Sequence, residues 1–344
     1  MLDCLKPSSS SIRSNHHSQP QGSSRDDTLS SSSQPSPRGN LTYAYSIAVQ
    51  TNSYSELWSM IHPQNSSQES NIENGKDQTA EQLLVDVLKP SHDCIEAFLC
   101  QIKQTTLTRL VSDYFRHSED TSLRCIHLQT NVRSARTLYH HLHVLLDVLP
   151  PDFDTNPLSQ PQCNRAFDIL LEFNGFDNPF PCPSSHFFGD MRTCFSLLKQ
   201  QLEQRRNRSC SQGPLIPVLF ACQKNRKELA QVEAAARGIF VLNNHLDTID
   251  RLVRHLHNAV EDDKPLIQLG TDWGKDIYAI QRVLKQLSLN HHTFFRQLKE
   301  LEEHICLCFL YINSVRSLLL EKLQSSAGSI IHESAGSIIH ESAS

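Results

Sequence analysis

Glycine is scarce in this chain, at 11 of 344 residues, well below the roughly 7% that is usual in globular proteins. The 16 prolines fall between the apolar stretches rather than inside them. Because residues that break helices are few or lie outside the apolar stretches, the composition favours an all-α fold. A chain of this length contains either two domains of average size or one long helical domain with disordered ends.

An excess of one charge is also absent, since 32 basic residues stand against 37 acidic ones. No chain-wide field exists to hold nucleic acid, so we expect no nucleic-acid partner. The 11 cysteines lack paired spacing, and no signal peptide opens the chain. Cys94, Cys194 and Cys308 fall among leucines on expected helix faces, which is typical of reduced, buried thiols in the cytosol.

Catalytic motifs are missing as well. The sequence contains no Gly-x-Ser-x-Gly elbow, no glycine-rich phosphate loop and no His-Glu-x-x-His helix. Acidic residues are plentiful, but we expect Glu300, Glu302 and Glu303 to lie on a solvent-facing side and to aid solubility. We therefore expect no enzymatic activity, no cofactor and no small-molecule substrate.

His140, His141 and His143 form one group of histidines, and His291 with His292 forms a second, which raises the question of a metal site. Adjacent helical residues point about 100° apart, so within these groups only His140 and His143 share a face. A structural or solvent-facing role is therefore favoured, and no metal is expected. His291 falls at a core position, where it either sets helix register or is a buried histidine with a satisfied hydrogen bond.

The clearest pattern is an apolar heptad repeat from residue 274 to residue 322. Its two seam positions, three and four residues apart, form one stripe on a helix ~70 Å long, which other helices must cover. The first position holds Ile277, Leu284, His291, Leu298, Ile305, Ile312 and Leu319, and the second holds Ile280, Leu287, Phe294, Leu301, Cys308 and Val315.

A second heptad pattern runs over residues 224–262, and residues 264–274 are expected to form the loop between the two helices. Two long helices joined by one short loop predict an antiparallel hairpin over residues 224–323, whose apolar stripes cover each other. The seam residues expected to carry this packing are Leu246, Ile249, Val253, Leu256, Leu284, Leu287, Leu298, Leu301 and Ile305.

The rest of the chain divides by composition. Residues 1–40 are rich in serine and proline and are expected to be disordered, because they cannot bury enough apolar surface. Residues 41–79 form a short segment and a polar linker, and a helical bundle domain spans residues 80–323. In this domain we expect a helix with Ser91 as N-cap that ends near His117, and further helices over 121–149, up to Phe173, and over 185–206. The tail, residues 324–344, contains a duplicated octapeptide and is expected to be disordered.

The segment between the middle helices and the C-terminal hairpin has two interpretations, because basic residues flank its apolar run, residues 214–222. This run is too short to span a bilayer, which needs roughly 20 residues, and Asn313 and Arg316 interrupt the apolar run near the C-terminus. In one interpretation the cations bind lipid phosphates and the apolar residues enter the membrane interface. In the other, the run is a buried connector with solvated flanking charges. The residues of the membrane contact would be Arg205, Arg206, Arg208, Leu215, Ile216, Val218, Leu219 and Phe220.

Several strings of the sequence point to a family. They are LDTIDRLVRHLH at 246–257, VLKQL at 283–287 and LEEHICLCF at 301–309, preceded by AVQT at 48–51, SYSELW at 53–58, YFRHSE at 114–119 and NPFP at 178–181. Together they resemble the plant-specific uncharacterised protein family 0496, also described as similar to integrin-related plant antigens and as domain of unknown function 677. The resemblance covers residues 41–323, and none of its motifs is catalytic.

The resemblance implies a protein without established enzymatic activity that is associated with a membrane. In typical members a long apolar segment, with one or two membrane passes, lies between the middle helices and the C-terminal hairpin. Only residues 214–222 stand at that place here. The chain is therefore a shortened form at the membrane surface, a form without membrane contact, or the product of an incomplete gene model.

The sequence thus predicts an elongated all-α bundle with a long, antiparallel, coiled-coil-like C-terminal hairpin. We expect a non-enzymatic, membrane-associated structural or adaptor protein on the cytoplasmic side that binds a protein partner through helical surfaces. The alternative is a soluble cytosolic coiled-coil interaction module, because no full transmembrane segment is expected.

Overall fold

The computed structural model describes residues 45–62, 79–102, 104–149, 156–183, 187–211 and 219–341. For residues 106, 107, 209–211, 219–228 and 326–341 it describes the backbone and not the side chains. Helices joined by turns and short connections make up the described residues, and no strand occurs among them. This confirms the all-α prediction. The predicted disordered segment 1–40 lies outside the described residues.

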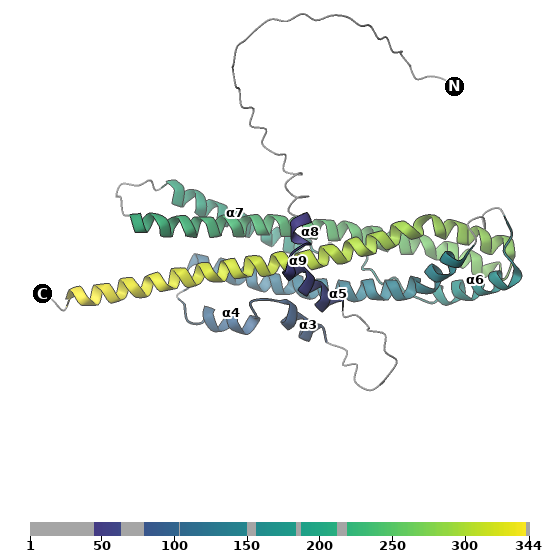
Figure 1. The fold of residues 1–344 in the computed structure, drawn as a ribbon, viewed down its shortest axis with the longest axis horizontal. Coiled ribbons are helices and arrows are strands. Elements are labelled where there is room, and N and C mark those ends of the chain that lie inside the picture. Colours follow the sequence, from purple (N-terminus) through teal and green to yellow (C-terminus); the bar gives the residue numbers. More distant parts are fainter. Residues whose placement is uncertain are drawn as a thin grey trace, which may run out of the picture.

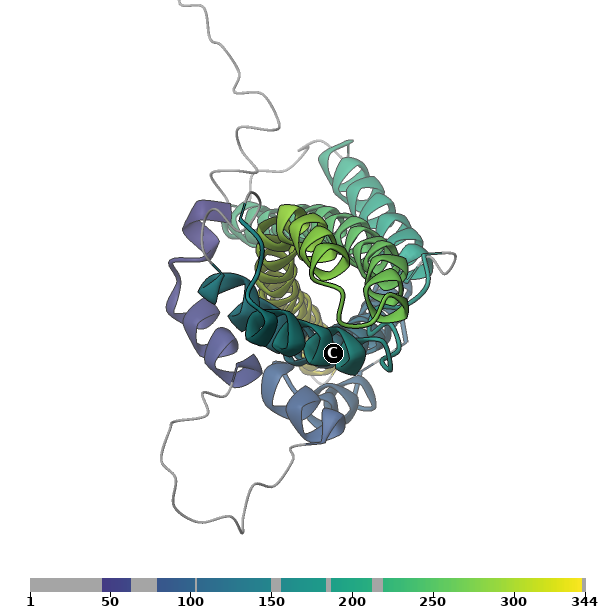
Figure 2. The ribbon, with the colours of Figure 1, turned by 90° about the vertical axis from the view of Figure 1, so that its right-hand side faces the viewer.

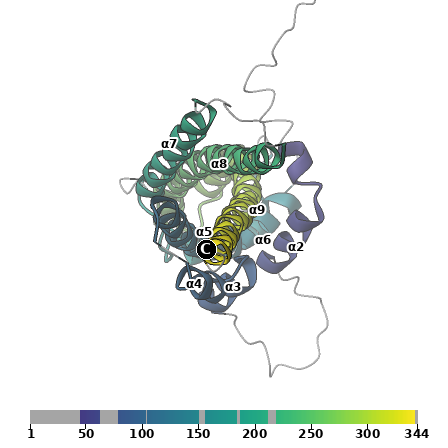
Figure 3. The same cartoon turned by 90° about the vertical axis from the view of Figure 1, so that its left-hand side faces the viewer.

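Two long helices dominate the molecule. The helices α8 (Leu219–Asp272) and α9 (Ile277–Glu341) form an antiparallel hairpin along the long axis, flanked by α5 (Thr106–Val148) and α7 (Gly189–Ser211) (Figure 1). In the view along this axis, α9 lies inside a ring of other helices (Figure 3). The elongated shape follows, because each long helix must cover the apolar stripe of its neighbours over many turns.

Four shorter helices pack against the long ones: α2 (Asn52–Ile61), α3 (Ala80–Val87), α4 (His92–Leu99) and α6 (Gln160–Phe173). At the hairpin end, α6 lies beside both α8 and α9 (Figure 2). Capping side chains define several starts: Thr51 accepts a hydrogen bond from the Tyr54 amide, and Thr79 forms a reciprocal capping box with Gln82. Ser91 is the N-cap residue of α4, as predicted, but makes no side-chain capping bond.

The prediction of a helix end near His117 was wrong, because α5 runs without a break through the polar residues around that point. The helix expected from Ser91 onward is also divided, because α4 ends at Leu99 and α5 begins after a capping box between Thr105 and Thr108. The Ser118 hydroxyl donates to the Phe115 carbonyl at 2.7 Å, and the Thr121 hydroxyl donates to the His117 carbonyl at 2.6 Å. Each hydroxyl therefore has its hydrogen-bond partner within α5, and both side chains are buried without breaking the helix.

The predicted loop over residues 264–274 was also wrong, because α8 continues through Pro265 to Asp272. Proline removes one hydrogen bond of a helix, but Pro265 is exposed, so water can satisfy the freed carbonyl. The next turn is held by burial of Ile267. The actual turn is short: Gly274 adopts a positive φ of 65°, and the Asp276 carboxylate caps α9 by accepting from the Ala279 amide at 2.8 Å.

Other boundaries moved less. The helix α7 covers Gly189–Ser211 rather than residues 185–206, and α8 starts at Leu219 rather than near residue 224. The α9 backbone is helical to Glu341. This range includes most of the tail that was predicted to be disordered, residues 324–344, and from residue 326 onward only the backbone is described. The short helix ending at Phe173 is present as α6.

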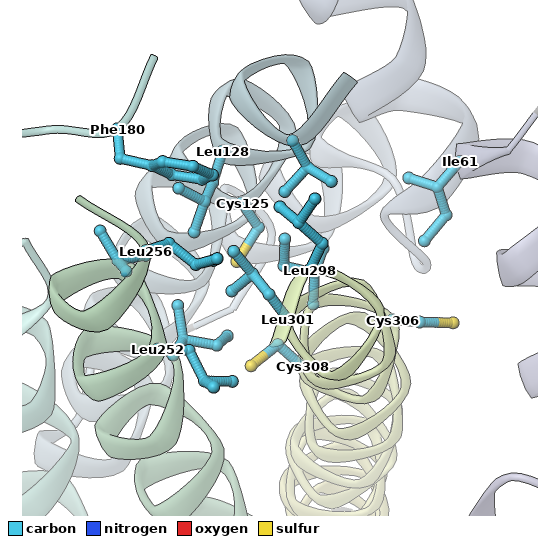
Figure 4. Close-up of a cluster of buried hydrophobic side chains, with 14 of the residues drawn as sticks. Ile61, Cys125, Leu128, Phe180, Leu252, Leu256, Leu298, Leu301, Cys306 and Cys308 are labelled. Atoms are coloured by element: carbon cyan, nitrogen blue, oxygen red, sulfur yellow. The ribbon is translucent and has the colours of Figure 1, made fainter. Parts of the chain in front are cut away.

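The core runs along the line where α5, α8 and α9 meet. Figure 4 shows Leu252 and Leu256 of α8 facing Leu301 and Cys308 of α9, with Cys125 of α5 nearby. Fully burying one large apolar side chain contributes about 1.5–3 kcal/mol. All nine seam residues are buried: Leu246, Ile249, Val253, Leu256, Leu284, Leu287, Leu298, Leu301 and Ile305.

Candidate functional site

A groove of about 800 Å³ lies between α5 and α6. Its α5 wall carries the polar side chains of Arg133, Arg136 and His140, whereas its α6 wall carries Ile169 and Phe173. A volume of this size falls within the range of small-molecule sites. A groove of this volume is a functional site only if its polar side chains are free to bind a ligand, so their hydrogen-bond partners decide what the groove can do.

Most of these polar groups already have partners within the protein. One Arg133 nitrogen donates to the Ile61 carbonyl at 2.5 Å, and the Arg136 guanidinium donates two hydrogen bonds to Glu302, at 3.1 and 2.7 Å. His141 pairs with Glu172 at 3.0 Å. The charged side chains of the groove therefore mainly join α5 to other elements.

Glu302 corrects the expectation that it would lie on a solvent face. It is buried, with 5% of its surface exposed, and it accepts from Arg136 and also lies 3.5 Å from His62. Burial raises the pKa of Glu302, but the hydrogen bonds from His62 and Arg136 outweigh it and lower the pKa overall. The carboxylate thus stays charged and links α2, α5 and α9.

Arg316 is a second charged residue inside the bundle. Its side chain is fully buried and donates to the Phe115 carbonyl, the Ser118 hydroxyl and the Pro90 carbonyl at 3.2, 2.7 and 2.9 Å. Glu119 lies 3.5 Å from the same guanidinium. Removing either charge of such a group leaves buried polar atoms unsatisfied, so Arg316 fixes α9 against α5 and the turn before α4.

Sequence reasoning missed both of these residues, although a signal was present. Glu302 and Arg316 each lie seven residues from Phe309, which is fully buried. Each of these three residues directly follows a residue at the second seam position, so they occupy a third buried position of the heptad repeat on α9. Because Phe309 is large and apolar, it indicated that Glu302 and Arg316, at the same heptad position, are buried as well.

One histidine from each predicted group pairs with the other across helices, and a second such pair forms between α8 and α9. His143 of α5 and His291 of α9 are joined by a 2.8 Å hydrogen bond, and His245 of α8 and His304 of α9 by another of 2.8 Å. His291 is therefore a buried histidine with a satisfied hydrogen bond. Among the described residues, no group of three His, Cys, Asp or Glu side chains is arranged to hold a metal ion.

Burial also determines the ionisation of these pairs. It lowers the pKa of His245 to about 3, and those of His291 and His304 to about 4. A neighbouring histidine also lowers the pKa of His245 and of His291, since two imidazolium ions cannot share a buried hydrogen bond. His245, His291 and His304 are therefore neutral near pH 7, and their hydrogen bonds connect α9 to α5 and α8.

The residues predicted for membrane contact are only partly described. Arg205, Arg206 and Arg208 occupy the last turns of α7. Leu215, Ile216 and Val218 lie outside the described residues, and Leu219 and Phe220 begin α8 with side chains that are not described. The structure thus places the three arginines together and leaves the apolar half of the prediction open.

The expectation that no segment could span a membrane needs correction. Within the described residues, the Ile277–Ser325 part of α9 contains a stretch long and apolar enough to cross a bilayer. More than half of this stretch is buried against other helices. A core helix of a soluble protein meets the same criteria, so this is weak support for a span.

Comparison with known proteins gives the family but no activity. The chain is 35% identical to the UPF0496 protein At3g19250 of Arabidopsis thaliana over 357 aligned positions, which cover 88% of this chain and 96% of that protein. The chain belongs to the UPF0496 family. A second Arabidopsis member, the UPF0496 protein At1g20180, is 36% identical over 27% of this chain and 24% of its own length. A putative UPF0496 protein 2 of rice is 32% identical over 27% of this chain and 23% of its own length.

No family model matches the sequence, and no solved structure is significantly similar to it. The names of the UPF0496 relatives give no substrate, partner or reaction. Function must therefore be argued from the surfaces of this chain.

Proposed function

We propose that this UPF0496 protein is a non-enzymatic helical adaptor that touches an anionic membrane surface with the end of α7 and the start of α8. The observation that carries the proposal is the cluster of Arg205, Arg206 and Arg208 in the last turns of α7. In the sequence five residues separate this cluster from the apolar run 214–222. Cations beside a short apolar run are the elements of a peripheral membrane contact.

The state of the arginines supports this proposal. Among the described residues, none of the three forms an ion pair with a carboxylate. Burial and the neighbouring Arg208 both lower the pKa of Arg205, as expected where like charges stand close together. An anionic surface would relieve this repulsion, and each cation near such a surface contributes about 1 kcal/mol.

A peripheral contact fits the packing of α9 better than a spanning one. Leu301, Ile305 and Phe309 are fully buried in the bundle, and Arg316 is held among carbonyl groups. To insert α9 into a bilayer, the protein would have to give up this packing and place Arg316 in hydrocarbon, which costs several kcal/mol. We therefore propose that α9 remains in the bundle when the protein is at the membrane.

The alternative is a soluble cytosolic interaction module. It is favoured by the exposed aromatic residues at the hairpin turn, where Trp273 is 66% and Tyr278 is 78% exposed. Large aromatic side chains on a surface commonly mark protein contacts. In this alternative the arginine cluster meets an acidic protein rather than a lipid.

A vesicle assay on the purified full-length protein tests the membrane contact. We expect it to sediment with vesicles that contain phosphatidylserine and not with phosphatidylcholine alone, and high salt should release it. Replacing Arg205, Arg206 and Arg208 with glutamate should abolish sedimentation. The matched control replaces three exposed arginines elsewhere, Arg109, Arg116 and Arg165, and should sediment like the wild type. Equal sedimentation of both variants would refute the proposed contact.

Fractionation of plant cells provides the cellular test. Release of the tagged protein from membranes by salt or carbonate supports a peripheral contact. Recovery in the soluble fraction supports the soluble module. Retention until detergent is added indicates that the protein is inserted or is held by an integral partner.

A further inference from the structure

The outward face of α9 and the turn before it carry a row of cations. From residue 277 to residue 299 the sequence contains no aspartate or glutamate, although the whole chain has more acidic than basic residues. The row runs from residue 275, just before α9, to residue 299, and its helical part, residues 277–299, is about 33 Å long. Its basic members, all exposed, are Lys275, Arg282, Lys285, Arg296 and Lys299.

The spacing of this basic row repeats the spacing of the buried seam. Tyr278, Leu289 and His292 fill the gaps, so that the steps from residue 275 to residue 299 alternate between three and four without interruption. These three side chains are also exposed, and the exposed fractions of Tyr278 and Leu289 are 78% and 65%. The helix α9 thus carries one heptad stripe that the bundle covers and a second stripe that it does not.

Four of the five cations in the basic row have no ion pair, or only an exposed one, among the described residues. Among the described residues, Arg282 and Arg296 form no ion pair. Lys275 lies 3.5 Å from Asp168, and Lys299 lies 3.9 Å from Glu303. Both are exposed pairs of little strength, so these lysines can exchange their partners for stronger ones at low cost.

The surroundings favour a narrow partner over a flat one. The row is one side chain wide, and at the same end of the molecule α8 exposes Glu261, Asp262 and Asp272. A flat anionic bilayer imposes no spacing on its contacts and would meet these carboxylates as well. A helix lying along α9 makes its contacts at steps of three and four residues and needs only one stripe.

We infer that the basic row is a docking surface for an acidic helix of a partner protein. Carboxylates of that helix, spaced alternately three and four residues apart, pair with the cations, while Tyr278 and Leu289 pack against apolar side chains between them. This inference gives a partner class to the adaptor role and rests on that role. It does not depend on the membrane contact, which uses other residues at the end of α7.

The test uses the full-length protein and two labelled synthetic peptides of about 24 residues. One peptide carries glutamates in alternating steps of three and four on a helix, and the other has the same composition with that spacing disrupted. We expect the first to bind at least about tenfold more tightly, and R282E with R296E to reduce its affinity by at least about tenfold. The matched pair R109E with R116E, on exposed positions of α5, should bind like the wild type.

Several outcomes overturn the inference. Equal binding of both peptides would remove the role of spacing, and unchanged affinity of R282E with R296E would remove the role of the row. Loss of phosphatidylserine vesicle binding in that variant, without peptide binding by the wild type, would assign the row to lipid.

Circular dichroism melting checks that the variants fold, and R282Q with R296Q gives a milder second pair. Because the vesicle assay depends on Arg205, Arg206 and Arg208, failure of one proposal is distinguishable from failure of the other.

Discussion

At the scale of single residues, the polar side chains inside the bundle connect its helices. Arg316 satisfies carbonyl groups from two other segments, and Glu302 accepts from Arg136 and contacts His62. Tyr139 donates to Asp263 at 2.8 Å. Each contact joins residues far apart in the sequence. Such contacts select one arrangement of long apolar helices, which otherwise slide past each other at little cost.

The buried histidines predict that acid destabilises the fold. In the unfolded chain histidine titrates near pH 6.5, whereas burial holds the pKa of His245 near 3 and those of His291 and His304 near 4. The unfolded state therefore binds more protons between about pH 6.5 and about pH 4, and stability falls as the pH decreases through this window. Asp263 opposes the effect, because burial raises its pKa to about 6 and the folded state binds that proton first.

After solvent screening, we expect a net loss of about 2–4 kcal/mol in the free energy of unfolding between about pH 7.5 and about pH 4.5. Urea denaturation followed by circular dichroism measures it. The double variant His245→Leu with His304→Leu removes two of the titrating groups and should show a weaker pH dependence. A wild-type stability that is constant over this range would contradict the assignment of these histidines as neutral in the folded state.

At the scale of elements, helix ends and crossings depend on few residues. The start of α5 is set by the capping box at Thr105, and the end of α8 by the turn at Gly274. Where α8 crosses α9, Gly238 leaves room for Val315, and a Cβ at Gly238 would overlap the Val315 Cγ2. Small residues at such crossings let two helix backbones approach closely.

Gly238→Ala is accordingly expected to destabilise the protein by about 1–2 kcal/mol, despite about 1 kcal/mol gained in helix propensity. Val315 cannot turn away easily, because a β-branched side chain has one preferred rotamer in a helix. Urea denaturation measures the change. Gly175→Ala is the control, since its Cβ would meet only the Glu172 carbonyl, at 3.8 Å. Adding Val315→Ala should recover part of the loss in Gly238→Ala, and equal stability of the two glycine variants would exclude the close crossing.

At the scale of the whole molecule, burial is distributed unevenly. The helix α9 packs against α8, α5, α2 and α6, and every residue from position 305 to position 309 of this helix is buried. In contrast, Ile95 is the one buried residue of α4. Segments with few buried contacts open at lower free energy than the core.

The rate of amide hydrogen exchange should therefore differ between the core of the bundle and its short outer helices. We expect peptides from residues 298–319 of α9 to exchange most slowly, and peptides from α3 and α4 to open with a free energy at least about 2 kcal/mol lower. Exchange followed by mass spectrometry makes this comparison at one pH on the same sample. Equal protection of α4 and α9 would mean that the short helices belong to the same cooperative unit as the core.

Local periodicity was enough to predict the all-α class and the long hairpin, because a heptad repeat is a property of consecutive residues. The sequence also contained the family strings, and the comparison with UPF0496 proteins supports the family that they indicated. The lack of acidic residues from 277 to 299 was likewise readable in the sequence. What that lack means was not, since only packing shows which face of α9 stays outside.

The tertiary structure decided what depends on contacts between distant residues. Pro265 lies in a helix whose next turn buries Ile267, and polar residues near His117 do not end α5 because their side chains bond to the helix and pack inside. Glu302 is buried because Arg136, 166 residues away, meets it. The sequence alone therefore determined the helices and the stripe that must be covered. Packing decided where the helices end, which charges lie inside, and which stripe of α9 stays exposed.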